Sequence, residues 1–82
     1  MGTILLVDDE ESILNMVRRV LENRGYAVLA ALNAQEAQAH WNAEKSRITL
    51  LITDVVLPGP SGVEIGRKLR KECPELPIIC MS

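Results

Sequence analysis

Two stretches of the chain decide its expected fold: ILLVDDEE at residues 4–11 and LLITD at residues 50–54. Each is a short apolar run that ends in carboxylates, as is typical of strands buried on both faces of a parallel sheet. Because parallel strands end at the same edge, we expect Asp8, Asp9 and Asp54 to converge. Three close carboxylates repel one another unless a cation lies among them, and oxygen ligands of this kind suit Mg²⁺. The sequence therefore predicts a magnesium site suited to phosphoryl chemistry.

Composition restricts the class of protein. The 82 residues are 48% hydrophobic and 24% charged, which is typical of a globular domain. The net charge of −2 comes without a basic patch, so we expect no direct contact with nucleic acid. No apolar run reaches the length of a membrane span, and no secretory signal is recognisable. Two cysteines are too few for a disulfide framework, and the expected location is cytoplasmic.

Strand and helix patterns alternate along the chain. In the first helix, Ile13, Val17, Val20 and Leu21 recur at helical spacing, and Gly25 is the expected stop. The capping pairs Asn33–Glu36 and Ser61–Glu64 are expected to open the next two helices. The expected strands cover residues 3–7, 26–30, 49–53 and 77–81.

This alternation predicts successive right-handed βαβ units and hence an α/β fold with a parallel sheet. Ligands of such sheets bind outside the carboxyl ends of the strands. Asp8, Asp9, Asp54 and Ser82 all follow expected strands, so all four are candidate site residues.

The pattern resembles the receiver domain of two-component response regulators. The matching pieces are the acidic pair in residues 4–10, Asp54 after the third strand, the loop from Asp54 to Gly62 with Pro58, and Ser82 after the fourth strand. The match covers essentially the whole chain. It implies a flavodoxin-like parallel sheet with alternating helices.

The resemblance also implies a function. Asp54 would be the phosphoacceptor, taking a phosphoryl group from a sensor histidine kinase, a phosphotransfer protein or a small acyl phosphate. Asp9, Asp54 and the backbone carbonyl of Val56 would bind Mg²⁺ directly, and Asp8 would bind it mainly through a water. Ser82 would donate its hydroxyl to a phosphoryl oxygen. The chain would be a signalling switch that catalyses only its own phosphorylation, rather than an enzyme with a separate substrate.

One departure from the family pattern concerns the elements that follow the fourth strand. The family continues with a fourth helix, a fifth strand that carries a lysine, and a fifth helix. Residues 1–82 are therefore expected to be an incomplete receiver domain, truncated after the fourth strand. Lys68 and Lys71 cannot replace that lysine, because they lie about 9 and 14 Å along the third helix from Gly62. The exposed apolar edge at residues 77–81 is expected to favour self-association.

Two other functions stay open at this level. A receiver-like module could bind a partner protein without carrying phosphate. A hydrolase with an aspartate nucleophile could use a similar sheet, with a second acid two residues after the nucleophile. Asp8 and Glu10 can be fitted to that spacing, but no threonine follows at the usual place. The run from Asp8 to Glu11 also has a plain structural interpretation, as negative charge at a helix N-terminus. Asp54 alone could be an ordinary turn residue.

Overall fold

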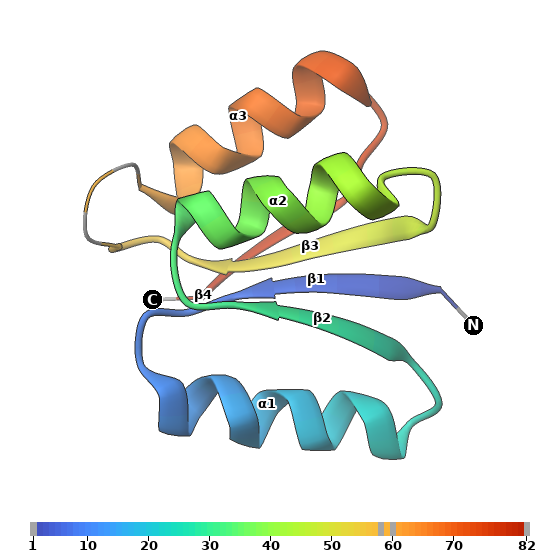
Figure 1. Cartoon of the computed structure of the whole chain (residues 1–82), viewed down its shortest axis with the longest axis vertical. Helices are drawn as coiled ribbons and strands as arrows, with labels where there is room; N and C mark the ends of the chain where they lie inside the picture. Colours follow the sequence, from blue (N-terminus) through green and yellow to red (C-terminus); the bar gives the residue numbers. More distant parts are fainter. Residues whose placement is uncertain (1, 58, 60, 82) are drawn as a thin grey trace.

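The computed structural model describes residues 2–57, 59 and 61–81. Strands and helices alternate through them as the sequence predicts (Figure 1). The elements are β1 (Thr3–Val7), α1 (Glu11–Asn23), β2 (Ala27–Ala31), α2 (Ala34–Glu44), β3 (Ile48–Asp54), α3 (Gly62–Glu72) and β4 (Ile78–Met81). None of the described helices is long and apolar enough to cross a membrane.

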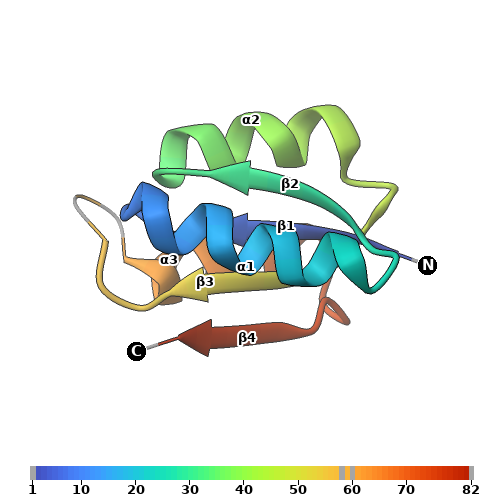
Figure 2. The ribbon, with the colours of Figure 1, turned by 90° about the horizontal axis from the view of Figure 1, so that it is seen from below.

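The four strands form one parallel sheet in the order β2-β1-β3-β4. Helix α1 covers one face of the sheet, and α2 and α3 cover the other (Figure 1). All four strands point the same way, so their carboxyl ends share one edge (Figure 2). The predicted parallel α/β fold is confirmed.

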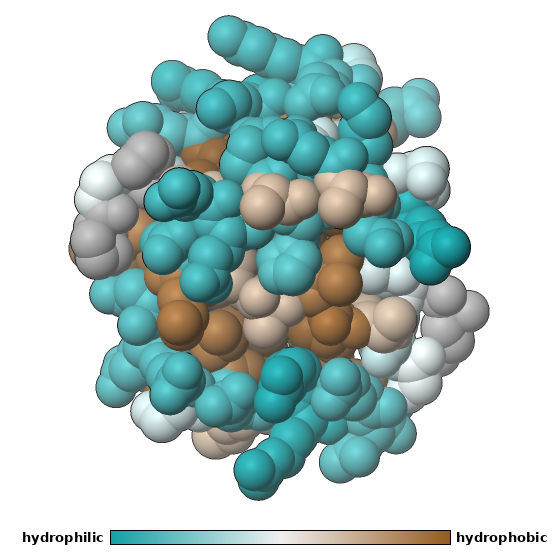
Figure 3. Space-filling model, in the orientation of Figure 1, coloured by the Kyte–Doolittle hydropathy of each residue, from teal (hydrophilic) through white to brown (hydrophobic). Residues whose placement is uncertain are grey.

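Apolar side chains fill both interfaces between sheet and helices. Between α1 and the sheet, the buried residues are Ile4, Leu6, Leu14 and Ile52. The larger cluster beneath α2 and α3 includes Trp41. Strand β1 contributes to both clusters, which explains why its sequence is a continuous apolar run. Figure 3 shows apolar side chains in a band at the level of the sheet, between polar helix surfaces.

The buried face of helix α1 differs in part from the apolar stripe expected from the sequence. Leu14 is its buried residue, with Val17 and Leu21 packed against the same cluster. Ile13 and Val20, by contrast, are 36% and 53% exposed. Each lies one residue before a core position, which turns it about 100° around the helix, away from the sheet. The spacing of Ile13 and Val20 is helical, but the prediction that they share the inward face is wrong.

A hydrogen-bonded cluster joins α2 to α3 at the end remote from the strands' carboxyl ends. Trp41 is buried, and its Nε1 donates to Oε2 of Glu72 at 3.0 Å. The other carboxylate oxygen of Glu72 accepts from Nζ of Lys45 at 3.2 Å. The polar atom of a buried tryptophan needs such a partner. Trp41 therefore acts as a packing residue.

The helix ends follow their sequence signals. Asn33 Oδ1 accepts from the N–H of Glu36 at 2.8 Å, and Ser61 Oγ accepts from that of Glu64 at 3.3 Å. At the end of α1, Gly25 has a φ of 92°. Its N–H donates to the carbonyl of Glu22, and the next N–H donates to the carbonyl of Leu21. These two bonds define a Schellman cap, which favours glycine at the left-handed position.

Gly25→Ala is expected to destabilise the fold by roughly 1 kcal/mol, because a Cβ is unfavourable at this φ. For a domain of this size the melting temperature should fall by about 4–8 °C. Thermal unfolding followed by circular dichroism measures the change. The control is Asn23→Ala, at the exposed last residue of the same helix, which should leave the melting temperature nearly unchanged. Equal effects of the two substitutions would contradict the assignment.

Candidate functional site

Three carboxylates meet at the carboxyl edge of the sheet. Asp8 and Asp9 follow β1, and Asp54 is the last residue of β3. The parallel register sets Val7 beside Thr53, so the residues that follow on each strand are neighbours. One carboxylate oxygen from each aspartate lies within 4.8 Å of the other two. The structure thus brings together the three aspartates that the sequence predicts will converge.

The three side chains differ in exposure and in backbone contacts. Asp8 is 4% exposed, and its Oδ1 accepts from the N–H of Glu10 at 2.9 Å. Asp54 is half-buried, and its Oδ1 accepts from the N–H of Val56 at 3.1 Å. Asp9 is exposed. Backbone hydrogen bonds therefore orient two of the three carboxylates, while the third reaches the site from the solvent side.

The chemistry of this donor set fits a hard cation. Neither of the ion pairs seen within the described residues includes Asp8, Asp9 or Asp54. Close carboxylates without a cationic partner are mutually repulsive, and burial of Asp8 increases the cost of its charge. Oxygen ligands alone are what Mg²⁺ prefers, and it commonly keeps several waters as well.

The first turn of α3 packs directly against the end of β3. A Cβ at Gly62 would collide with the backbone carbonyl of Asp54 and lie 2.9 Å from Oγ1 of Thr53. Thr53 is fully buried, and its hydroxyl donates to that same carbonyl at 3.0 Å. The N–H of Gly62 donates to the carbonyl of Val55 at 3.1 Å. These contacts fix the backbone that carries Asp54.

Thr53 was not singled out by the sequence patterns, and Gly62 was expected only to shape the loop and the helix entry. The available signal was weak: a hydroxyl residue that interrupts an apolar strand just before a candidate site residue. Val56 is 77% exposed in the loop after Asp54. Its carbonyl as a metal ligand stays a prediction. Ser82 and Pro58 lie outside the described residues.

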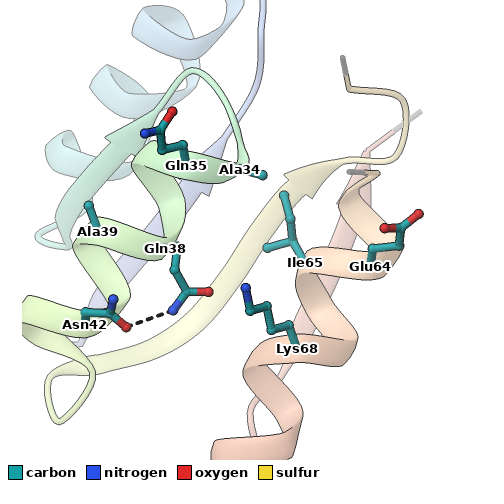
Figure 4. A pocket seen from close by; sticks show the side chains of 8 residues that line it. All are labelled: Ala34, Gln35, Gln38, Ala39, Asn42, Glu64, Ile65 and Lys68. Atoms are coloured by element: carbon teal, nitrogen blue, oxygen red, sulfur yellow. Dashed lines mark hydrogen bonds between the residues drawn. The ribbon is translucent and has the colours of Figure 1, made fainter. Parts of the chain in front are cut away.

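The other polar residues considered lie away from the carboxylates. Lys68 lines a groove between α2 and α3, opposite Gln38 and Asn42, as Figure 4 shows. His40 is half-buried on α2, and its Nε2 lies 2.9 Å from the carbonyl oxygen of Ala30. Because a carbonyl can only accept, Nε2 carries the hydrogen. Neither residue forms part of the carboxylate cluster.

A parallel sheet with an oxygen-rich site at its carboxyl edge defines an α/β domain built to bind a ligand at that edge. Comparison with known proteins specifies the class. The family model of the response regulator receiver domain matches residues 4–82. The chain belongs to this family and is a receiver domain of the two-component response regulator type.

Relatives with curated descriptions agree. The chain is 40% identical over 82 residues to the phosphate regulon transcriptional regulatory protein PhoB of Pseudomonas aeruginosa, covering 98% of this chain and 35% of that protein. It is 38% identical over 79 residues to the alkaline phosphatase synthesis transcriptional regulatory protein PhoP of Bacillus subtilis, covering 96% of this chain and 32% of that protein. The chain thus spans about a third of the length of these relatives.

Solved structures agree as well. A response regulator receiver domain protein from Clostridium thermocellum superposes with a TM-score of 0.93 at 32% identity, covering 98% of this chain and 64% of that chain. The response regulator TrrA from Thermotoga maritima, solved in complex with Mg²⁺ and BeF, gives a TM-score of 0.88 at 34% identity, covering 98% and 68%. The flavodoxin-like fold expected from the sequence is confirmed.

Gly62→Ala is expected to destabilise the fold by about 1–3 kcal/mol, because the new Cβ overlaps the Asp54 carbonyl and the backbone has to move. Amide chemical shifts at Asp54 and Val56 should move with it. Denaturant unfolding and two-dimensional NMR measure the two effects. The control is Val63→Ala, at the exposed next residue, which should change stability by less than about 0.5 kcal/mol. Unchanged Asp54 shifts in the Gly62 variant would contradict the proposed contact.

Proposed function

We propose that this chain is a phosphoacceptor module that takes a phosphoryl group onto Asp54 in the presence of Mg²⁺ and acts as a signalling switch. The observation that carries the proposal is the meeting of three carboxylate oxygens within 4.8 Å, with Asp54 at the end of a central strand. The donor would be a sensor histidine kinase or a phosphotransfer protein. The chain would catalyse its own phosphorylation only.

Asp54 is suited to the role of nucleophile. The Val56 N–H holds Oδ1, which fixes the rotation of the carboxylate and makes its two oxygens different. Attack by an Asp54 carboxylate oxygen forms an O–P bond, while the P–N bond of a phosphohistidine breaks and its electron pair returns to the imidazole. With an acyl phosphate, a P–O bond breaks and the carboxylate leaves. Thr53 and Gly62 keep the backbone of Asp54 fixed during this exchange.

The remaining acids are suited to hold the metal. Asp9 and Asp54 would be direct ligands, together with the carbonyl of Val56. Asp8 is buried and already accepts a backbone hydrogen bond, which supports contact through a coordinated water. Bound Mg²⁺ would neutralise charge on the phosphoryl oxygens and align the displacement. Ser82 would donate a hydrogen bond to a phosphoryl oxygen and report the phosphorylated state.

We also propose that residues 1–82 form the N-terminal portion of a receiver domain that continues with a fourth helix, a fifth strand and a fifth helix. In support, the chain covers only 64% of the Clostridium thermocellum receiver chain although it superposes closely on it. The fifth strand would add the lysine that the family pattern includes. The chain's partners and output therefore belong to the longer protein.

Asp54→Asn is expected to abolish phosphorylation, because an amide cannot replace the attacking carboxylate. Incubation of the 82-residue chain with acetyl phosphate and Mg²⁺, followed by intact mass spectrometry, should give a single phosphoryl adduct in wild type and none in the variant. The adduct should also disappear when EDTA is added. The control is Glu22→Gln, an exposed acid on α1, which should retain the adduct.

A phosphoryl adduct that persists in Asp54→Asn would show that another residue accepts the group. A folded wild-type chain that gains no adduct would favour the alternative function, a receiver-like module that binds a partner protein without phosphate.

Asp9→Asn is expected to weaken Mg²⁺ binding on the order of 10-fold or more, because it removes one of the negatively charged oxygen ligands. Isothermal titration calorimetry with MgCl₂ measures the dissociation constant without depending on phosphorylation. Glu11→Gln is the matched control, since Glu11 lies two residues further on, outside the carboxylate cluster. Equal loss of affinity in both variants would mean that general negative charge, rather than coordination, holds the ion.

A further inference from the structure

A groove of about 510 Å³ lies between α2 and α3, and Figure 4 shows the side chains that line it. Its volume falls within the range of small-molecule sites, about 300–1,000 Å³. None of the three clustered aspartates lines it. The groove is therefore a feature separate from the carboxylate site.

The size of the side chains explains why the two helices leave this space. At the end remote from the carboxylates, the large side chain of Trp41 packs in the core and its Nε1 bonds to Glu72 of α3. Nearer the carboxyl edge of the sheet, α2 contributes Ala34 and Ala39 to the groove, and their methyl groups fill little of it. Together with Ile65 on α3, these alanines give the groove an apolar surface.

An ion pair closes one end of the groove. Nζ of Lys45 on α2 lies 3.2 Å from Oε1 of Glu72 on α3. Lys45 follows Asn42 by three residues and Glu72 follows Lys68 by four, so the pair bridges the helices about one turn beyond the lining residues. A peptide that ran along the groove would meet this bridge, whereas a compact molecule would not. The closed end favours a small ligand over a continuous chain.

The groove does not depend on elements that follow β4. Helix α2 leads from β2 to β3 and α3 leads from β3 to β4, and both lie on the same face of the sheet (Figure 1). Because such crossovers share one hand, a helix that leads from β4 to a strand beside it would lie next to α3, on the side away from α2. The proposed fourth helix therefore leaves the groove open.

Lys68 supplies a positive charge to the groove. Figure 4 shows its ammonium group directed across the groove toward Gln38, while the carboxylate of Glu64 points away. Neither of the ion pairs among the described residues includes Lys68 or Glu64. The facing wall on α2 is uncharged: Nε2 of Gln38 donates to Oδ1 of Asn42 at 2.8 Å, and the amide nitrogen of Asn42 is itself a donor. An anion beside Lys68 would meet no carboxylate on that wall.

We propose that the groove between α2 and α3 is a binding site for a small organic carboxylate, whose charge pairs with Lys68 and whose apolar body lies against Ala34 and Ile65. The lining combines what such a ligand needs, namely a suitable volume, an apolar surface and one cation that faces uncharged side chains. A ligand with several negative charges fits less well, because the groove offers one lysine and also contains Glu64. The proposal does not depend on the phosphoacceptor function.

Titration of the 82-residue chain with 2-naphthoate, followed by two-dimensional amide NMR, tests the site. Amide shifts should move at Ala34, Gln38, Ile65 and Lys68, and they should saturate with a dissociation constant in the range of about 1 mM or below. Asp54→Asn should bind the probe as tightly as wild type, since Asp54 does not line the groove. Failure of this site and failure of the phosphoacceptor are thus distinguishable.

Lys68→Met removes the charge and keeps most of the side-chain stem. We expect the dissociation constant of 2-naphthoate to rise about three- to fivefold, the upper part of what an exposed ion pair contributes. Lys71→Met is the matched control, because it makes the same change at another exposed lysine of α3 that does not line the groove. It should change the dissociation constant by less than about 1.5-fold at physiological ionic strength, where distant charges are screened.

The uncharged analogue 2-naphthamide tests the ion pair from the side of the ligand. Wild type should prefer 2-naphthoate to 2-naphthamide by the same factor, and the preference should disappear in Lys68→Met, because the two changes remove one shared interaction. Three results would each overturn the proposal: no saturable shifts at the groove residues up to about 10 mM probe, equal weakening in both lysine variants, or a preference for the carboxylate that persists in Lys68→Met.

Discussion

The parallel register between β1 and β3 is the constraint on which the rest of this structure depends. Pairing of Val7 with Thr53 brings the ends of two separate strands to one level, and their acids follow. A shift of one residue would exchange the side chains that pack beneath α1 with those that pack beneath α2 and α3. The buried residues of β1 on both faces resist such a shift. The hydrophobic core therefore determines where the carboxylates lie, although electrostatic repulsion between them disfavours this arrangement.

This opposition explains how the site is built. Carboxylates held close together cost stability, so the chain supports them with rigid backbone instead of long side-chain contacts. Glu10 and Val56 each supply an N–H to an aspartate oxygen, and Thr53 and Gly62 hold the carbonyl next to Asp54. Part of the folding free energy of the core is thus offset by the mutual repulsion of the three carboxylates. A cation would remove that cost, which is the physical basis for expecting one.

Much of this could be predicted from the sequence, for identifiable reasons. Apolar runs that end in acids give both the strands and the convergence of Asp8, Asp9 and Asp54, because a parallel sheet has only one carboxyl edge. Caps at Asn33 and Ser61 are local signals read within four residues. Periodicity failed where the outcome depends on tertiary placement. On α1, the same helical spacing allowed two neighbouring stripes, and only docking on the sheet selects one.

Local sequence patterns do not predict contacts between segments that are far apart in the chain. The Trp41–Glu72 hydrogen bond joins residues 31 positions apart, and no local sequence signal near either residue predicts it. The packing of Gly62 on Asp54 similarly depends on how the β3–α3 loop closes. No sequence signal marks His40, yet it is half-buried and its Nε2 donates to the carbonyl of Ala30 on β2. These are positions where a residue's role is set by its partner rather than by its own sequence context.

The carboxyl edge and the β4 edge are physically connected. Asp54 pairs with Met81, and the N–H of Val55 donates to the carbonyl of Met81. Met81, the last residue of β4, therefore helps to hold the backbone that carries Asp54. In this fold, the backbone that carries Asp54 and the end of β4 belong to one hydrogen-bonded ladder, so the site rests on β4 as well as on β1 and the first turn of α3.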